Sequence, residues 1–249
     1  MRRALRKPNA KSPKPMILGL DTATECLHLA LVDGDRAWTR REVTVPGHGH
    51  SERLLPAVDA LLAEAGARPA DLTGVACCVG PGGFTALRIG VATAEGLALT
   101  GLPTWGFSAF ELRAAALAAA GHQGLAWILL DGQRKEAFVQ AWDGRALAPA
   151  RKVPLAELPA LVGADPWWAP EAFAAKLAEG LPDLDPDHRL AVDEDAHTRA
   201  GLVALTRACA GRAPEAPLQP FYLRETDAEL NFPEAAAHLD EAHRRGLSR

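Results

Sequence analysis

The sequence is poor in the residues that mark several large classes of protein. It has four cysteines, one tyrosine and 6% aromatic residues among 249 positions. None of the cysteines forms a C-x-x-C pair, which argues against a disulfide scaffold and against a zinc ribbon. No apolar run approaches the roughly 18 residues that a membrane span requires. We therefore expect a globular, cytoplasmic protein without a membrane anchor.

The four cysteines are Cys26, Cys77, Cys78 and Cys209. We interpret them as small buried hydrophobic residues in a reducing compartment, with a metal or redox role as the alternative. Cys77 and Cys78 are adjacent in an apolar run, so on a strand they would point to opposite faces of the sheet.

Positive charge is concentrated at one end of the chain. The first fifteen residues hold six of the 27 basic residues and no acidic one. We interpret residues 1–15 as a flexible, solvated extension, with a cationic arm that touches RNA as the alternative. The remaining chain has 21 basic and 31 acidic residues, so its body should repel a phosphate backbone. Autonomous nucleic-acid binding is disfavoured.

The first half of the chain alternates between strand and helix patterns. Ser51 suits the N-cap of a helix with apolar helical spacing, Gly66 suits its end, and Pro56 should bend it slightly. Asp33-Gly34 separates two alternating runs and predicts a hairpin. The expected elements are a strand at 16–23, a hairpin at 26–45, a helix at 51–65, a strand at 72–80, a helix at 84–99 and a strand at 103–107.

The second half repeats this pattern at a constant offset of 110 residues. Residues 127–144 overlay 17–34 without a gap, so Asp131 matches Asp21. A duplicated β-β-β-α-β-α unit predicts an α/β protein with two similar lobes facing a cleft. The expected units are the N-terminal lobe at 16–107, the C-terminal lobe at 108–225 beginning with a linking helix at 108–120, and a partly helical tail at 226–249. In the second lobe we expect helices at 154–162, 171–179 and 198–210, and strands at 166–169 and 189–192.

Two turns are candidates for binding a nucleotide in this cleft. Asp21, Thr22 and Thr24 follow the first strand, where open α/β sheets place ligands. Gly82 and Gly83 precede a helix N-terminus, which attracts anions. The first turn lacks the glycine that phosphate loops use, and the second fits no nucleotide fingerprint. The alternatives are an Asx turn at Asp21 and a purely structural glycine turn.

Catalytic and metal motifs are weak in the sequence. His48 and His50 lie in a loop, and no H-E-x-x-H accompanies them, so we predict no metal site. The segment around Ser108 lacks the closing glycine of a nucleophile elbow, and Ser108 is better suited to cap the linking helix.

The helices at 51–65 and 84–99 are the more informative segments. Small residues such as Gly90 and Ala92 recur along the second helix, although a glycine there costs about 1 kcal/mol relative to alanine. Close approach of neighbouring backbones is the expected reason. Together with the apolar first helix, it could form half of a helical interface, with Arg88 anchoring the glycine turn or a partner carboxylate.

Five segments resemble one protein family. They are ILGLDTATE, GHGHSERLLPAVDALLAEAG, VGPGGFTALRIGVATAEGLAL, LDGQRKEAFV and PFYLRE. The chain is similar over residues 16–225 to the bacterial TsaB (YeaZ) family of tRNA threonylcarbamoyladenosine synthesis. Gly83 and Ala86 depart from the serine and glycine common there, and the arginine of the family's L-D-A-R segment has no counterpart at Gln133.

The resemblance implies an actin-like ATPase (ribonuclease H-like) fold and a non-catalytic subunit that docks a TsaD-type catalytic subunit. It implies a TsaE-type ATPase as a further partner, tRNA contacted only indirectly, no tightly bound cofactor, and ATP only within the larger complex. The interface residues it implies, on the helices at 51–65 and 84–99, are Leu54, Leu55, Val58, Leu61, Leu62, Arg88, Ala92 and Glu95. The competing hypotheses are a small actin-fold ATPase or kinase, a metallopeptidase-like enzyme acting in the cleft, and a homodimer through the same helices.

Overall fold

A computed structural model describes residues 15–43 and 49–224. The predictions for the tail at 226–249, for His48 and for all but the last residue of the basic extension concern residues outside this part of the chain. Within the described ranges, no helix is long and apolar enough to cross a bilayer.

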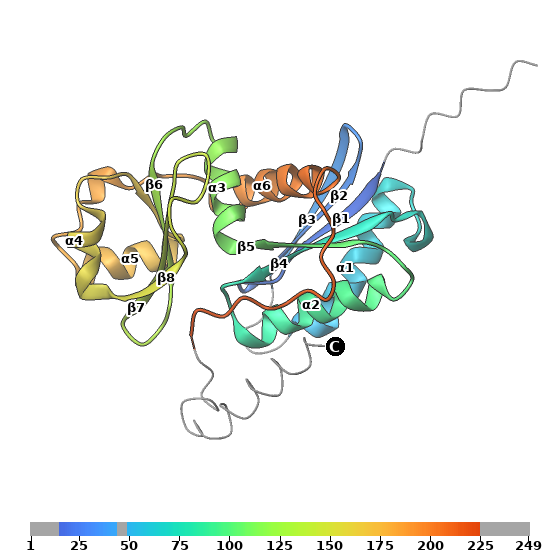
Figure 1. The fold of residues 1–249 in the computed structure, drawn as a ribbon, viewed down its shortest axis with the longest axis horizontal. Helices are drawn as coiled ribbons and strands as arrows, with labels where there is room; N and C mark the ends of the chain where they lie inside the picture. The colour runs from blue at the N-terminus through green and yellow to red at the C-terminus, as the bar shows by residue number, and fades with distance from the viewer. Residues whose placement is uncertain (1–14, 44–48, 225–249) are drawn as a thin grey trace, which may run out of the picture.

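The molecule has two lobes, each with its own sheet, and helices lie outside and between the sheets (Figure 1). The N-terminal sheet has the order β3-β2-β1-β4-β5, and the second sheet has the order β8-β7-β6-β9. The first sheet consists of β1 (Met16–Asp21), β2 (Cys26–Asp33), β3 (Arg36–Val43), β4 (Gly74–Gly80) and β5 (Thr104–Ser108), and the second of β6 (Ala126–Asp131), β7 (Glu136–Trp142), β8 (Arg151–Pro154) and β9 (Trp167–Trp168).

The two sheets are built alike because they follow the internal repeat. β1 pairs antiparallel with β2 and parallel with β4, and β6 pairs antiparallel with β7 and parallel with β9. This shared arrangement of a hairpin and a parallel strand confirms the predicted fold class, two similar α/β lobes of the actin-like type. The strand predicted at 189–192 is wrong: Arg189 makes only an isolated bridge to Trp167, so the second sheet ends at β9.

Six α-helices are found among the described residues. They are α1 (His50–Ala65), α2 (Phe84–Ala98), α3 (Ala109–Ala119), α4 (Leu158–Val162), α5 (Glu171–Gly180) and α6 (Glu194–Cys209), and short 3-10 turns occupy Pro69–Asp71, Leu155–Glu157 and Pro186–His188. α1 and α2 cover one face of the N-terminal sheet. α6 packs on the same sheet and against α3, and α3 lies between the two lobes (Figure 1).

Burial separates the molecule into three apolar clusters that match these layers. One lies between the N-terminal sheet and the α1–α2 pair, and another lies under α4 and α5. The third surrounds α3 and α6 and takes residues from both lobes. Cys77 belongs to the first of these clusters and Cys78 to the third, which confirms the prediction that they face opposite sides of the sheet.

Two of the predicted helix caps are confirmed and one is wrong. Gly66 ends α1 in the left-handed region at φ 68°, as predicted. Ser108 caps α3 by accepting a hydrogen bond from Glu111 N, while the Glu111 carboxylate accepts one from Ser108 N. The predicted N-cap at Ser51 is wrong, because α1 begins one residue earlier and its N-cap is Gly49.

The last helix crosses back to the first lobe. α6 was predicted within the second lobe by sequence position, but it packs on β1 and β2 and alongside α3. Glycines allow this close approach: a Cβ added at Gly201 would lie 2.7 Å from Ala116 N, and one at Gly19 would lie 2.1 Å from Thr206 Oγ1. The α3–α6 pair is therefore a shared wall between the lobes.

Candidate functional site: the interlobe cleft and the α1–α2 face

The first strand of each copy of the internal repeat ends in an equivalent turn, and the two turns lie on opposite sides of a cleft. Asp21 Oδ1 accepts a hydrogen bond from Ala23 N at 2.9 Å, and Asp131 Oδ1 accepts one from Gln133 N at 2.8 Å. Both are Asx turns that end the first strand of their sheet. The structure thus supports the structural interpretation of the Asp21 turn.

The second carboxylate oxygens of these aspartates have different partners. Lys176 Nζ lies 2.8 Å from Asp131 Oδ2 at an accessible position. Arg113 Nη1 of α3 lies 3.8 Å from Asp21 Oδ2, and the two side chains are 2% and 0% exposed. Because an unpaired buried carboxylate is costly, Arg113 supplies the compensating charge that Asp21 requires.

His28 extends this buried network toward the surface. Its Nε2 lies 3.2 Å from Asp195 Oδ1 of α6, and Arg41 Nε lies 2.8 Å from the same oxygen. The carboxylate can only accept, so the ring proton of neutral His28 belongs on Nε2. Burial lowers the pKa of His28, and the carboxylates of Asp21 and Asp195 offset only part of that effect. The network joins β1, β2, β3, α3 and α6.

The glycine turn before α2 is held against the Asp21 turn. Gly83 N donates to Ala23 O at 2.9 Å, and a Cβ added at Gly82 would lie 2.4 Å from the same oxygen. Thr22 Oγ1 donates to Ala86 O at 2.8 Å. Close backbone packing therefore explains the glycine at position 82. The Thr22 hydroxyl proton and the Gly83 N–H are already donated to backbone oxygens of the protein, so neither is available to a ligand.

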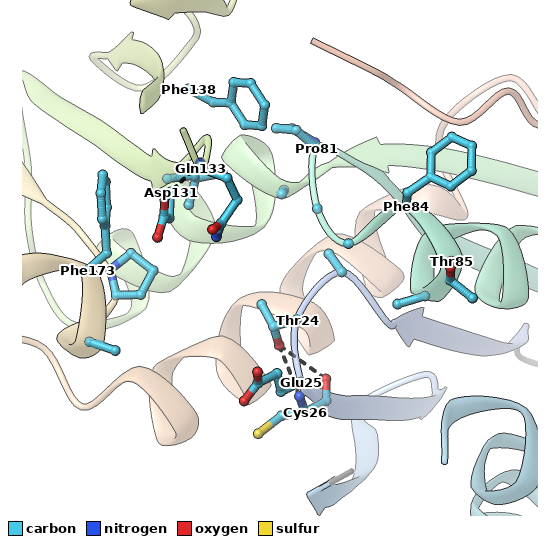
Figure 2. Close-up of a pocket in the computed structure, with 18 of the residues that line it drawn as sticks. Thr24, Glu25, Cys26, Pro81, Phe84, Thr85, Asp131, Gln133, Phe138 and Phe173 are labelled. Carbon is cyan, nitrogen blue, oxygen red and sulfur yellow. Dashed lines mark hydrogen bonds between the residues drawn. The ribbon is translucent and has the colours of Figure 1, made fainter. Parts of the chain in front are cut away.

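A cleft of about 1350 Å³ separates the lobes. Thr24, Glu25 and Cys26 line one side, and Asp131 and Phe138 lie across from them (Figure 2). Acidic and basic groups both line it, so the cleft does not have one dominant sign of charge. Cys26 was predicted as a buried residue, but it is half-buried here and its Sγ accepts a hydrogen bond from Arg41 at 3.3 Å.

The structure divides the five candidate nucleotide-binding residues. Thr24, Gly82 and Gly83 line the cleft. Asp21 and Thr22 are fully buried and do not line it. A ligand in this cleft would therefore meet the Thr24 and glycine turns but would not reach the Asp21 carboxylate without a rearrangement.

No grouping of three or more potential metal ligands occurs in the described ranges, which exclude His48. His50 Nε2 donates to Thr24 O at 2.9 Å. His50 was expected in a loop, but it is the first residue of α1. The contact fastens the start of α1 to the Asp21 turn.

The predicted interface residues of α1 need a correction. Leu54, Val58, Leu61 and Leu62 are almost fully buried and pack on the N-terminal sheet. Leu55 alone of the five is exposed, at 52%. The apolar spacing therefore identifies the face of α1 that packs on the N-terminal sheet. That contact buries the other four side chains, so they are not available to a partner.

The α2 residues lie differently. Ala92 and Arg88 are exposed, and Glu95 is half-buried. The Arg88 guanidinium stacks 3.9 Å from the centre of the Phe84 ring, and its Nε donates to Tyr222 Oη at 3.1 Å. It anchors neither the glycine turn nor a carboxylate among the described contacts. Glu95 Oε1 accepts from Leu218 N at 2.8 Å.

Sequence reasoning missed the residues that tie distant elements together. Arg113, His28 and Asp195 carry no local motif, and each acquires its partner only when α3 and α6 pack on the first sheet. A buried arginine on an apolar helix is rare, and this was the one available signal.

Known proteins with the same arrangement support this description. The family model of TsaD, tRNA N6-adenosine threonylcarbamoyltransferase, matches residues 44–147. YeaZ from Pseudomonas aeruginosa superimposes with a TM-score of 0.68 at 24% identity, covering 84% of this chain and all of that one. The likeness shows a two-lobed actin-like fold.

Sequence relatives narrow the class further. An uncharacterized protein of Mycobacterium tuberculosis is 36% identical over 223 residues, covering 86% of this chain and 93% of that protein. The Escherichia coli tRNA threonylcarbamoyladenosine biosynthesis protein TsaB is 39% identical over 89 residues, covering 33% of this chain and 35% of that protein. The chain belongs to the TsaB (YeaZ) family.

Proposed function

We propose that this chain is a non-catalytic subunit in the synthesis of threonylcarbamoyladenosine in tRNA. In this proposal it docks a TsaD-type catalytic subunit through the outer surface of α1 and α2. The Escherichia coli relative TsaB is named as a tRNA threonylcarbamoyladenosine biosynthesis protein, and it matches 33% of this chain. A TsaE-type ATPase would join the same assembly, and tRNA would be held by the partners because the body of this chain is acidic.

The burial of Asp21 against Arg113 is the observation that carries the proposal. An actin-fold kinase or ATPase needs an acidic group that reaches a metal or its waters at the end of the first strand. Here that acid is fully buried and neutralised by an arginine. This arrangement favours a role outside the cleft over the ATPase, kinase and metallopeptidase alternatives.

The docking surface in this proposal differs from the predicted one. It consists of the small and apolar side chains on the outer surface of the two helices, which also exposes charged residues of α1 such as Glu52, Asp59 and Glu64. These side chains are Leu55, Pro56 and Ala63 on α1, and Ala92 and Gly96 on α2, with Leu99 at its C-terminal end. Leu99 is 90% exposed. Small and apolar residues on two adjoining helices allow a second helix pair to approach closely, which suits helix-on-helix packing.

The decisive experiment measures binding of the purified chain to a TsaD-type subunit by calorimetry. We expect Leu55→Glu and Ala92→Glu to weaken binding at least about tenfold, because each buries a charge in the interface. Leu147→Glu is the matched control, since Leu147 is 50% exposed on the other lobe and should bind like the wild type. Circular dichroism checks that all three variants remain folded.

A tRNA modification assay completes the test. The catalytic subunit should form threonylcarbamoyladenosine with wild-type chain and lose yield with Leu55→Glu. Wild-type affinity in both charged variants would contradict the surface, and full modification without this chain would contradict the function. A homodimer through the same face should dissociate as the catalytic subunit is added, which size-exclusion chromatography would detect.

A further inference from the structure

After α6 the chain runs in an extended path along the first lobe toward the second; we call this segment the strap (residues 212–224; Figure 1). It begins along the edge of the first sheet, where Trp105 Nε1 donates to Arg212 O at 3.1 Å. Glu215 N donates to Thr104 O at 2.7 Å, and Thr104 Oγ1 donates to Glu215 O. These contacts fix the strap on β5.

The middle of the strap lies on β4 and α2. Leu218 N donates to Glu95 Oε1 at 2.8 Å, and Phe221 N donates to Val79 O at 2.6 Å. A Cβ added at Gly80 would lie 2.6 Å from Phe221 O, so the strap backbone packs directly on this glycine. The strap thus reaches the first turn of α2 as a fixed segment.

Its last residues bridge the lobes. Tyr222 stacks on Phe84 with ring centres 5.2 Å apart and accepts a hydrogen bond from Arg88. Two residues later, Arg224 donates to Gln133 O at 3.0 Å and to the Glu136 carboxylate on the other lobe. The Arg224 guanidinium, with Lys152 contributing, holds the pKa of Glu136 below its usual range.

The strap connects three of the segments that resemble the family. FTALR contributes Phe84 and Arg88, PFYLRE contributes Tyr222 and Arg224, and LDGQRKEAFV contributes Glu136. Tyr222 contacts Phe84 and Arg88, and Arg224 contacts Glu136. Phe84 and residues 221–224 also line the cleft. A movement of the second lobe can therefore reach α2 through three strap residues.

We propose that Tyr222 and Arg224 are positioning residues, which tie the first turn of α2 to the second lobe and thereby set the geometry of the α1–α2 docking face. The effect on docking rests on the proposed function, whereas the tie itself does not. Arg224 binds Glu136 on the second lobe, and Tyr222 contacts Arg88 and Phe84 on α2.

Hydrogen–deuterium exchange of the full chain without a partner tests the tie. Glu136→Gln and Arg224→Gln should speed exchange in peptides covering residues 84–90, as should Tyr222→Ala. Lys152→Gln is the matched control. Lys152 Nζ lies 3.4 Å from Glu136 Oε1 and has no hydrogen bond or ion pair with the strap among the described residues, so exchange at 84–90 should be unchanged. These side chains are partly exposed, so the variants should fold. Unchanged exchange in Glu136→Gln and Arg224→Gln would overturn the tie.

Binding to the TsaD-type subunit tests the consequence for docking. Glu136→Gln should weaken affinity about two- to fivefold, the range of a partly exposed ion pair, with Lys152→Gln at the wild-type value. Faster exchange at 84–90 with unaltered affinity would refute the positioning role. If the wild-type chain does not bind the catalytic subunit, the proposed function fails, and the exchange experiment still decides whether the tie exists.

Discussion

Arg113 Nη1 lies 3.8 Å from Asp21 Oδ2 in the interior, although one residue belongs to the middle helix and the other ends the first strand. The guanidinium also donates to Thr198 Oγ1 at 3.1 Å and faces the Trp168 ring of the second lobe at 5.8 Å. One side chain therefore neutralises the first-lobe acid, binds α6 and contacts the other lobe. A substitution at Arg113 should therefore weaken the packing of α3 against the first sheet, α6 and the second lobe together.

The first prediction concerns this pair. Arg113→Met should lower the free energy of unfolding by about 3–5 kcal/mol, because the Asp21 carboxylate would stay buried without a counter-charge. The double variant Arg113→Met with Asp21→Asn should recover part of the loss. Arg145→Met removes an exposed arginine and should cost less than about 0.5 kcal/mol. Urea denaturation measures all three, and equal losses at both arginines would contradict the interpretation.

The second prediction concerns the pH dependence of stability. Burial lowers the folded-state pKa of His28 below its unfolded value of about 6.5. The unfolded chain thus takes up a proton first, so the contribution of His28 is complete above pH 6.5 and is lost as pH falls toward the folded pKa. The loss can reach about 1.4 kcal/mol per pH unit in that window.

Denaturation of wild type and His28→Gln between pH 7.5 and 5 checks this effect. The variant should show a shallower decline of stability as the pH falls. Leu27→Val, a substitution at the neighbouring buried position, should lower stability at every pH without changing the slope. Identical slopes in wild type and His28→Gln would show that His28 does not contribute.

The third prediction compares two glycines of α2. A Cβ added at Gly90 would lie 2.3 Å from Thr22 Oγ1, whereas one at Gly96 meets nothing within 4 Å. Gly90→Ala should destabilise the fold by about 1–3 kcal/mol through overpacking. Gly96→Ala should stabilise it by about 0.5–1 kcal/mol through helix propensity. Thermal unfolding should move the two midpoints in opposite directions, and a shift in the same direction would refute the packing argument.

The fourth prediction concerns thiol reactivity. Burial raises the pKa of Cys77 and Cys78 and raises that of Cys209 to about 11. These thiols should remain protonated and shielded at pH 8, while the half-buried Cys26 faces the cleft. A thiol reagent should label one cysteine rapidly in the native chain and four in denaturant. Rapid native labelling that survives Cys26→Ser would contradict the assignment.

Local patterns determined much of this fold. The Asp-Gly turns appear at equivalent places, with Gly34 at φ 60° and Gly144 at φ 64°. The strand and helix order of the first half and the internal repeat follow from side-chain periodicity and turn residues, which act over a few positions. In the second half, the strand predicted at 189–192 is absent and β8 was not predicted. The family segments and the Asx turn at Asp21 were also readable, because each depends on neighbours in the chain.

Only the tertiary structure decided which surfaces and charges are available. Periodicity shows that α1 has an apolar face, yet it does not show whether a sheet or a partner covers that face. Only the tertiary structure shows that Leu61 is buried on the sheet and that Leu55 is exposed. The Asp21–Arg113 pair and the strap contacts of Arg224 join residues far apart in sequence. Such partners are set by how helices dock on sheets, and a buried charge becomes stable only after that docking has brought its counter-charge near.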